Sequence, residues 1–193
     1  MTALHELPKT LVLGVGNVLF GDEGLGVHLA SLLQANYRFS TDSNPAALPL
    51  AIVDGGTLGP HLIPLLADYR RVLLLDSITA NGVAPGEVFC FDYRQVPAPL
   101  SGRGSAHEVE MHQTLAMMRL AGDIPQITVL AAVPEIISET TFQLSPEAQR
   151  AAVLMEQKAL DILAQWGYQA TRVAAAPIAE IAHHCCRGGA CGP

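Results

Sequence analysis

The sequence predicts an α/β fold: a three-layer sandwich in which a mostly parallel, twisted sheet of about five strands has helices on both faces. Short, continuous apolar runs alternate along the chain with segments whose apolar residues recur at helical spacing. This alternation is typical of strands that are buried on both faces and covered by helices. Half of the 193 residues are apolar and only 15% are charged, so the chain has enough apolar material for one large core.

The first half of the chain supplies three strands and two helices to this prediction. The runs 10–15, 50–53 and 71–75 are short, rich in apolar side chains, and followed or interrupted by glycine or aspartate, as expected for buried strands that end in tight loops. Residues 24–34 and 58–67 carry apolar side chains at helical spacing. Strands that alternate with helices in this way pair in parallel.

The second half adds two strands and two helices. The segment 87–93 follows the preceding strand through a short turn, so we expect it to lie antiparallel at or near an edge of the sheet. The helix at 105–122 begins with a capping-box spacing in which Ser105 is the N-cap. The run 127–133 is expected to be the last strand, and a long helix follows at 145–166.

The expected domain organisation is a single α/β domain over residues 1–170 and a flexible tail over residues 171–193. The tail is rich in Ala, Pro, His, Cys and Gly and shows no apolar periodicity, which indicates a segment outside the core. Its histidines and cysteines are of the types that bind soft metals, but their spacing matches no closed zinc motif.

Charge and composition exclude several classes of partner. The formal net charge is −7, with 11 basic and 18 acidic residues, and the basic residues do not cluster, so we expect no nucleic acid partner. No apolar stretch approaches the roughly 20 residues that span a bilayer, so we expect no membrane partner. The first residues lack the pattern of a signal peptide, and three of the four cysteines crowd the end of the chain; both features favour a cytoplasmic location.

Ionisable side chains follow the first three predicted strands. These are Asp22 and Glu23, then Asp54, then Asp76, and His107 stands in the first turn of the helix after the long loop. Because ligands gather at the carboxyl ends of parallel strands, we expect these groups to meet at one edge of the sheet. Two carboxylates and an imidazole, those of Glu23, Asp76 and His107, form a metal-ligand set with room for water or substrate.

Simpler roles stay open for each of these residues. Asp22 fits an acidic residue that stabilises the start of a helix, Asp54 before two glycines fits a turn former, and His107 fits a surface histidine. Two other classes of site are disfavoured. The glycine-rich loop GVGNVLFG has Leu19 where a dinucleotide-binding fingerprint needs its third glycine, and the chain has no GxSxG nucleophile elbow.

Four segments, in this order and spacing, resemble the maturation endopeptidases of nickel-iron hydrogenases: GVGNVLFGDEGLGVHLA, VDGGTLG, LLLDSITANGVAPGE and SAHEVEMHQTLAMMRLAG. The similarity extends from about Leu11 to Gly167 and includes the proline and glutamate of AAVPE. It implies a helix-covered sheet and a protease that removes a C-terminal extension from the hydrogenase large-subunit precursor once nickel has been inserted. The family is catalogued among aspartic-type peptidases, although this chain has no paired DTG or DSG segment.

Carried over position by position, the resemblance implies that Glu23, Asp76 and His107 contact the metal, which is nickel supplied by the substrate. The catalytic candidates are Glu23, Asp76 and Asp22, because a carboxylate or a metal-bound water could attack the scissile carbonyl. The candidates for substrate binding are Asp54, Gly55, Gly56 and Thr57.

Three questions stay open at this point. The nickel could act as a Lewis acid or only as a recognition handle. The chain could instead be a nickel-binding chaperone that inspects the precursor without cutting it, or a metallohydrolase of small molecules that uses the same edge of the sheet.

Overall fold

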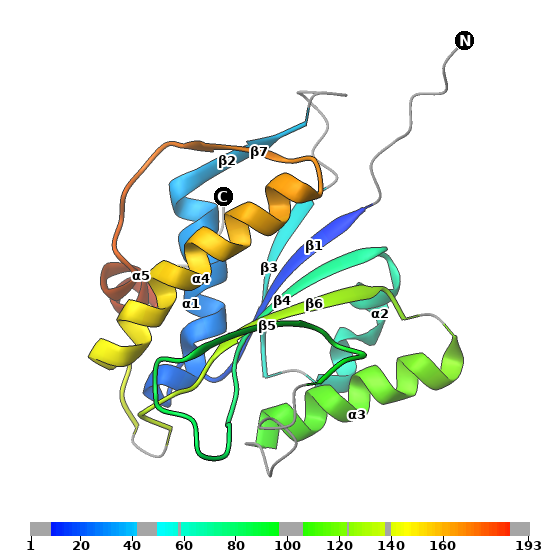
Figure 1. Ribbon diagram of the computed structural model, residues 1–193, viewed down its shortest axis with the longest axis horizontal. Coiled ribbons are helices and arrows are strands. Elements are labelled where there is room, and N and C mark those ends of the chain that lie inside the picture. Colours follow the sequence, from blue (N-terminus) through cyan, green and yellow to red (C-terminus); the bar gives the residue numbers. More distant parts are fainter. Residues whose placement is uncertain are drawn as a thin grey trace.

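The computed structural model describes residues 9–41, 50–57, 59–96, 106–122, 124–137 and 140–185. Its main sheet has five strands in the order β3-β1-β4-β6-β5 (Figure 1). The strands are β1 (Thr10–Val15), β3 (Leu50–Gly56), β4 (Arg71–Ser77), β5 (Val88–Asp92) and β6 (Gln126–Ala132). β1, β3, β4 and β6 are parallel, and β5 pairs antiparallel with β6 at the edge. The predicted sheet, with its one antiparallel strand, is confirmed.

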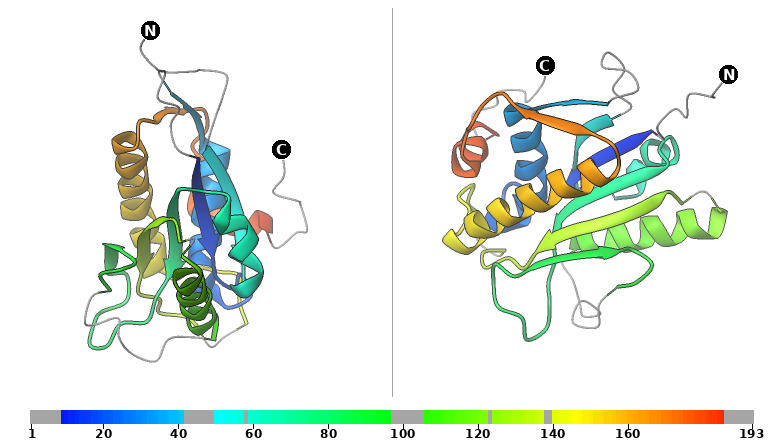
Figure 2. Two further views of the ribbon diagram at one scale, coloured as in Figure 1. Left: turned by 90° about the vertical axis from the view of Figure 1, so that its right-hand side faces the viewer. Right: turned by 45° about the horizontal axis from the view of Figure 1, so that its top comes forward.

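Helices cover both faces of this sheet, which confirms the predicted three-layer sandwich. One face carries α1 (Leu25–Asn36) and α4 (Pro146–Gln165), and the other carries α2 (Ile63–Ala67) and α3 (Ala106–Ala121) (Figure 2). Two single-turn 3-10 helices, η1 (Gly21–Gly24) and η2 (Gly59–Leu62), precede α1 and α2.

The strands divide their side chains between two cores, as the two-residue period of a strand requires. Val12 and Leu73 pack under α1 and α4, whereas Leu11 and Leu74 pack under α2 and α3. All four side chains are almost completely buried. Sheet strands that are apolar on both faces therefore separate two hydrophobic layers.

The long helix α4 begins where the sequence predicts. The Ser145 hydroxyl oxygen accepts a hydrogen bond from the Ala148 amide at 3.0 Å, and Pro146 occupies the first helical position. The predicted cap of α3, Ser105, lies outside the described residues.

The segment after residue 170 differs from the expected tail. β2 (Tyr37–Ser40) and β7 (Gln169–Arg172) pair antiparallel as a second, two-stranded sheet, so 127–133 is not the last strand. Next comes α5 (Ile178–Cys185), on the same face of the main sheet as α1 and α4. The expectation that the chain leaves the core at residue 171 is therefore wrong for residues 171–185.

Apolar burial and hydrogen bonds to Asn36 hold this segment in place. Ile178, Ile181 and Ala182 are buried in the core beneath α1 and α4. The Asn36 side chain, at the end of α1, donates to the Ala176 carbonyl at 2.9 Å and accepts from the Ala176 amide at 3.0 Å. Residues 186–193 lie outside the described part of the chain.

Two glycines allow α1 to sit close to the carboxyl ends of the strands. A Cβ added at Gly26 would overlap the backbone carbonyl oxygens of Leu75 and Val15, and one added at Gly16 would overlap the carbonyl oxygen of Glu23. Gly16 also has a φ of 132°, which L side chains rarely adopt. The first turn of α1 and the preceding η1 are thus pressed against the ends of β1 and β4.

Across the described ranges, no helix is both long enough and apolar enough to cross a membrane.

Candidate functional site

Glu23 and Asp76 lie on adjoining segments at the carboxyl edge of the main sheet. Glu23 is in η1, which follows β1, and Asp76 is the penultimate residue of β4. The Ser77 hydroxyl donates to the backbone carbonyl of Glu23 at 3.4 Å. The residue next to Asp76 therefore contacts Glu23 directly, as expected from the strand order.

Both acidic residues are nearly enclosed by the protein. Glu23 is 9% exposed and Asp76 is 4% exposed. One carboxylate oxygen of Asp76 accepts the backbone amide of Ser77 at 2.8 Å, which restricts the rotation of that side chain. Carboxylates in such surroundings are poorly hydrated, so a cation or a polar substrate group interacts with them more strongly than it would at the surface.

His107 lies in the first turn of α3, at the same end of the molecule. The 16 residues of α3 span about 24 Å, and the helix leads back to the start of β6, which runs parallel to β4. Its first turn therefore lies toward the end at which β4 finishes (Figure 1). The structure describes the backbone of His107 but not its side chain.

Among the side chains that the structure describes, no three His, Cys, Asp or Glu residues are grouped closely enough to hold a metal ion. Glu23 and Asp76 belong to this described set. A site with three protein ligands at this edge therefore needs a donor from outside this described set.

Asp22, the third catalytic candidate, faces inward. Its side chain is completely buried, and its carboxylate accepts four hydrogen bonds. The donors are the Glu135 amide at 2.9 Å, the Ile136 amide at 3.1 Å, and the amide and hydroxyl of Ser145, each at 2.7 Å. Asp22 thus joins η1 to Glu135 and Ile136 and to Ser145, the N-cap of α4, rather than capping α1.

The segment from Asp54 to Thr57 forms the end of β3, which is an edge strand. An Asp54 carboxylate oxygen accepts the Gly56 amide at 2.8 Å, so the turn-forming role considered for Asp54 is observed. The Gly56 carbonyl in turn accepts the Gly16 amide at 2.9 Å. Gly55 is buried, whereas Asp54 and Thr57 are exposed.

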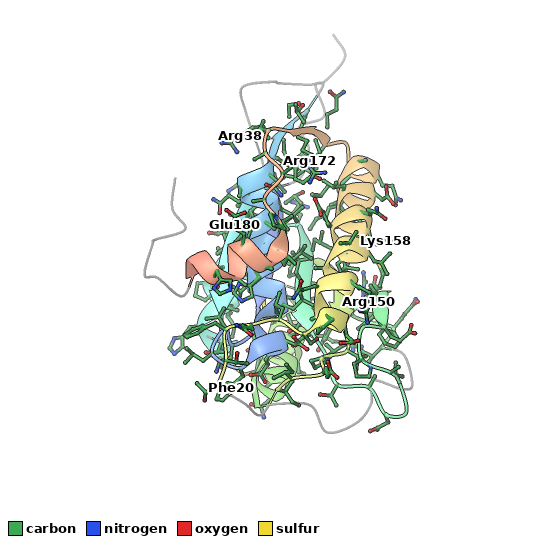
Figure 3. All side chains as sticks on the ribbon, turned by 90° about the vertical axis from the view of Figure 1, so that its left-hand side faces the viewer. Phe20, Arg38, Arg150, Lys158, Arg172 and Glu180 are labelled. Carbon is green, nitrogen blue, oxygen red and sulfur yellow. The ribbon has the colours of Figure 1, made fainter. Side chains whose placement is uncertain are left out.

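A pair of carboxylates that the sequence did not single out as site residues lies beside Asp22. A hydrogen bond from the protonated carboxyl of Glu135 to Glu147 raises the pKa of Glu135, and the hydrogen bond from Arg150 lowers the pKa of Glu147. Figure 3 shows Arg150 on the first half of α4 and Phe20 toward the end of the molecule opposite Arg38. The glutamate of the segment AAVPE is Glu135, so this segment could have drawn attention to it. Its partner Glu147 lies in a different element, and the sequence does not pair the two.

Another missed feature is His28, on α1. Its side chain is completely buried and neither ring nitrogen has a hydrogen-bond partner within the described structure. Burial alone lowers the pKa of His28 from 6.5 to about 4, so the ring is neutral at pH 7.

Comparisons with known proteins agree on one family. The model of the hydrogenase maturation protease family matches residues 27–162. The chain is 43% identical over 157 residues to protein HydD of Wolinella succinogenes, covering 81% of this chain and 96% of that protein. It is 29% identical over 165 residues to the hydrogenase 2 maturation protease of Escherichia coli K12, covering 84% of this chain and 94% of that protein.

A solved structure shows the same similarity in three dimensions. The hydrogenase maturating endopeptidase HybD from Escherichia coli matches with a TM-score of 0.75 and 28% sequence identity. The match covers 86% of this chain and 98% of that one.

Proposed function

This chain belongs to the hydrogenase maturation protease family, and from that premise we propose that it removes the C-terminal extension of a nickel-loaded hydrogenase large-subunit precursor and recognises the bound nickel. The observation that carries the proposal is the juxtaposition of Glu23 and Asp76, through Ser77, at the carboxyl edge of the sheet. The similarity to endopeptidases assigns the reaction class, and the two carboxylates supply groups suited to a cation.

The nickel in this proposal belongs to the substrate. Glu23, Asp76 and His107 offer two carboxylates and one imidazole, with no thiolate to favour a borderline or soft ion. Such a set holds nickel weakly by itself. Ligands from the precursor would complete the coordination, so that metal binding and substrate selection become the same event.

Peptide hydrolysis adds water to the scissile carbonyl, breaks the carbon–nitrogen bond and transfers a proton to the leaving amine. By gripping a metal fixed in the precursor, Glu23, Asp76 and His107 would place the nearby peptide bond for attack. A carboxylate of this set that is not occupied by the metal is suited to accept the proton of the attacking water. The nickel then serves as a recognition handle or as a Lewis acid.

The end of β3 is proposed as the place where the substrate chain binds. β3 is an edge strand, so an extended segment could form backbone hydrogen bonds beside Asp54, Gly55, Gly56 and Thr57. The cytoplasm, where the precursor would be synthesised, is the proposed location of the reaction.

The first experiment measures cleavage by mass spectrometry on purified precursor with and without nickel. Wild-type protein is expected to shorten only the nickel-loaded form, and Glu23→Gln, Asp76→Asn and His107→Ala are expected to abolish this cleavage while circular dichroism shows a retained fold. The control is Asp161→Asn, which neutralises an exposed carboxylate on α4. Binding without cleavage by wild type would indicate a chaperone, and hydrolysis of free peptides or esters alone would indicate a small-molecule metallohydrolase.

A second experiment locates the metal. Enzyme treated with a chelator, then freed of it, is expected to cleave nickel-loaded precursor at its original rate. If activity returned only after zinc or another metal was added to the enzyme, the metal would be the resident cofactor of the protease and the proposal would be wrong.

A further inference from the structure

We infer that Asp22 is a positioning residue, whose buried carboxylate holds η1 and therefore Glu23 in place, and that it does not attack the substrate. The inference rests on the proposed function and deepens it. It assigns different roles to two adjacent acidic residues that are equivalent candidates in the sequence.

The Asp22 carboxylate is saturated by protein donors. One oxygen accepts the Ser145 amide, and the other accepts the Ser145 hydroxyl and the amides of Glu135 and Ile136. An ionised carboxylate is acceptor-only and can take about four hydrogen bonds, so the surrounding donors use its full capacity. With no exposed surface, Asp22 could approach a scissile carbonyl only by leaving these bonds.

Backbone bonds on either side of this carboxylate also hold η1. The Asp22 amide donates to the Ile136 carbonyl at 3.0 Å, and the Gly21 amide donates to the Thr141 carbonyl at 2.7 Å. Next to Asp22, the Glu23 carbonyl accepts the Ser77 hydroxyl. The backbone of Glu23 is thus fixed between β4 on one side and Ile136 and Thr141 on the other.

An amide cannot replace this carboxylate without loss. In Asp22→Asn one oxygen becomes an NH2 group, which must face at least one of the backbone N–H donors that now point at Asp22. A donor would be left buried without an acceptor, and η1 would move to relieve it. Because a displacement of about 1 Å at a ligand can cost on the order of a hundredfold in rate, Glu23 would lose most of its effect while keeping its carboxylate.

The test measures how tightly nickel-loaded and nickel-free precursor bind to four proteins: wild type, Asp22→Asn, Glu23→Gln and the double variant. Binding is measured separately from cleavage. Asp22→Asn is expected to weaken binding of the nickel-loaded form at least tenfold and to leave binding of the nickel-free form unchanged. In the Glu23→Gln background, the Asp22→Asn change is expected to have no further effect, since the two substitutions remove the same contact.

Asn36→Asp is the matched control for a general loss of stability. It exchanges an amide for a carboxylate at a completely buried side chain with two backbone bonds, at the far end of α1. This variant is also expected to melt at a lower temperature, but it should bind both precursor forms with the affinity of wild type. If Asp22→Asn fails to fold, Ser145→Ala removes one of the four donors and is expected to weaken nickel-dependent binding in the same direction by several-fold.

The outcomes separate this inference from the function on which it rests. Wild type that neither cleaves the precursor nor distinguishes its nickel-loaded form overturns the proposed function itself. If wild type does both, three results for Asp22→Asn would overturn the positioning role alone. The variant could lose turnover with unchanged affinity, or bind both precursor forms more weakly to the same extent. Its effect could also add in full to that of Glu23→Gln.

Discussion

Replacing His28 by leucine should make the protein less sensitive to acid. The imidazole of His28 is completely buried. It is closely packed against the preceding turn, since a Cβ added at Gly24 would lie 3.2 Å from its Nε2 atom. Burial lowers the pKa of His28 from 6.5 to about 4. Between these two values the unfolded chain binds a proton that the folded protein excludes, so stability is lost as the pH falls through this window and is regained as it rises.

The magnitude follows from the size of the pKa shift. A depression of about 2.5 units corresponds to roughly 3 kcal/mol once the pH lies below both pKa values. Between pH 7 and pH 5 the unfolded chain takes up most of this proton and the folded protein takes up little. The free energy of unfolding therefore falls by about 2 kcal/mol over this range. At pH 7 the leucine variant should be as stable as wild type or more so, because it removes two buried ring nitrogens that have no hydrogen-bond partner among the described residues.

The assay is urea denaturation of wild type and His28→Leu at pH 7 and pH 5. Acidic groups titrate in both proteins, so the quantity to compare is the difference between their free energies of unfolding at each pH. This difference should shift by about 2 kcal/mol in favour of the variant at pH 5. His183→Gln, at an exposed position on α5, is the control and should show the pH dependence of wild type.

Two results would refute this reasoning. If the leucine variant lost stability between pH 7 and pH 5 as steeply as wild type, His28 would not be the group that takes up the proton on unfolding. If the variant were several kcal/mol less stable at pH 7, the imidazole would have a bonding partner and could not be regarded as a buried, unsatisfied ring.

Three further predictions concern packing. Deleting residues 173–193 should lower the melting temperature strongly and expose apolar surface to a fluorescent dye, because Ile178 and Ile181 leave the core; a wild-type melting curve would contradict the role given to α5. Asn36→Ala should cost about 2 kcal/mol in urea denaturation, since two partly buried backbone groups of Ala176 lose their partner, and an unchanged midpoint would show that water replaces the amide. Gly26→Ala should destabilise the protein and slow precursor cleavage, because the new methyl group overlaps the Leu75 carbonyl; unimpaired cleavage would show that α1 can shift freely.

The elements of the main sheet were predictable because their signals are local. Each of the strands β1, β3, β4 and β6 is a short apolar run between turn residues. The helices between them carry apolar residues at helical spacing. β2 and β7 were missed because each has only four residues of mixed polarity, YRFS and QATR. The helix α5 was missed because its eight residues are fewer than the roughly 11 to 18 over which helical spacing is recognised.

The site was predictable to the extent that chain direction determines it. Parallel strands finish at one edge, so the acidic residues just after β1 and at the end of β4 had to approach each other, and the structure brings Glu23 next to Ser77. The sequence also indicated the first turn of α3 as the position of His107, but not the path of its side chain.

What the sequence alone determined is the set of main-sheet elements, their parallel arrangement, and the edge at which the carboxylates gather. Only the tertiary structure separated Asp22 from Glu23, because the four donors to Asp22 come from residues 113 to 123 positions away. It also decided that residues 171–185 belong to the fold and that His28 is sealed inside it. Periodicity records which face of an element is apolar, whereas the partners and burial of a single polar side chain depend on distant segments that only folding brings together.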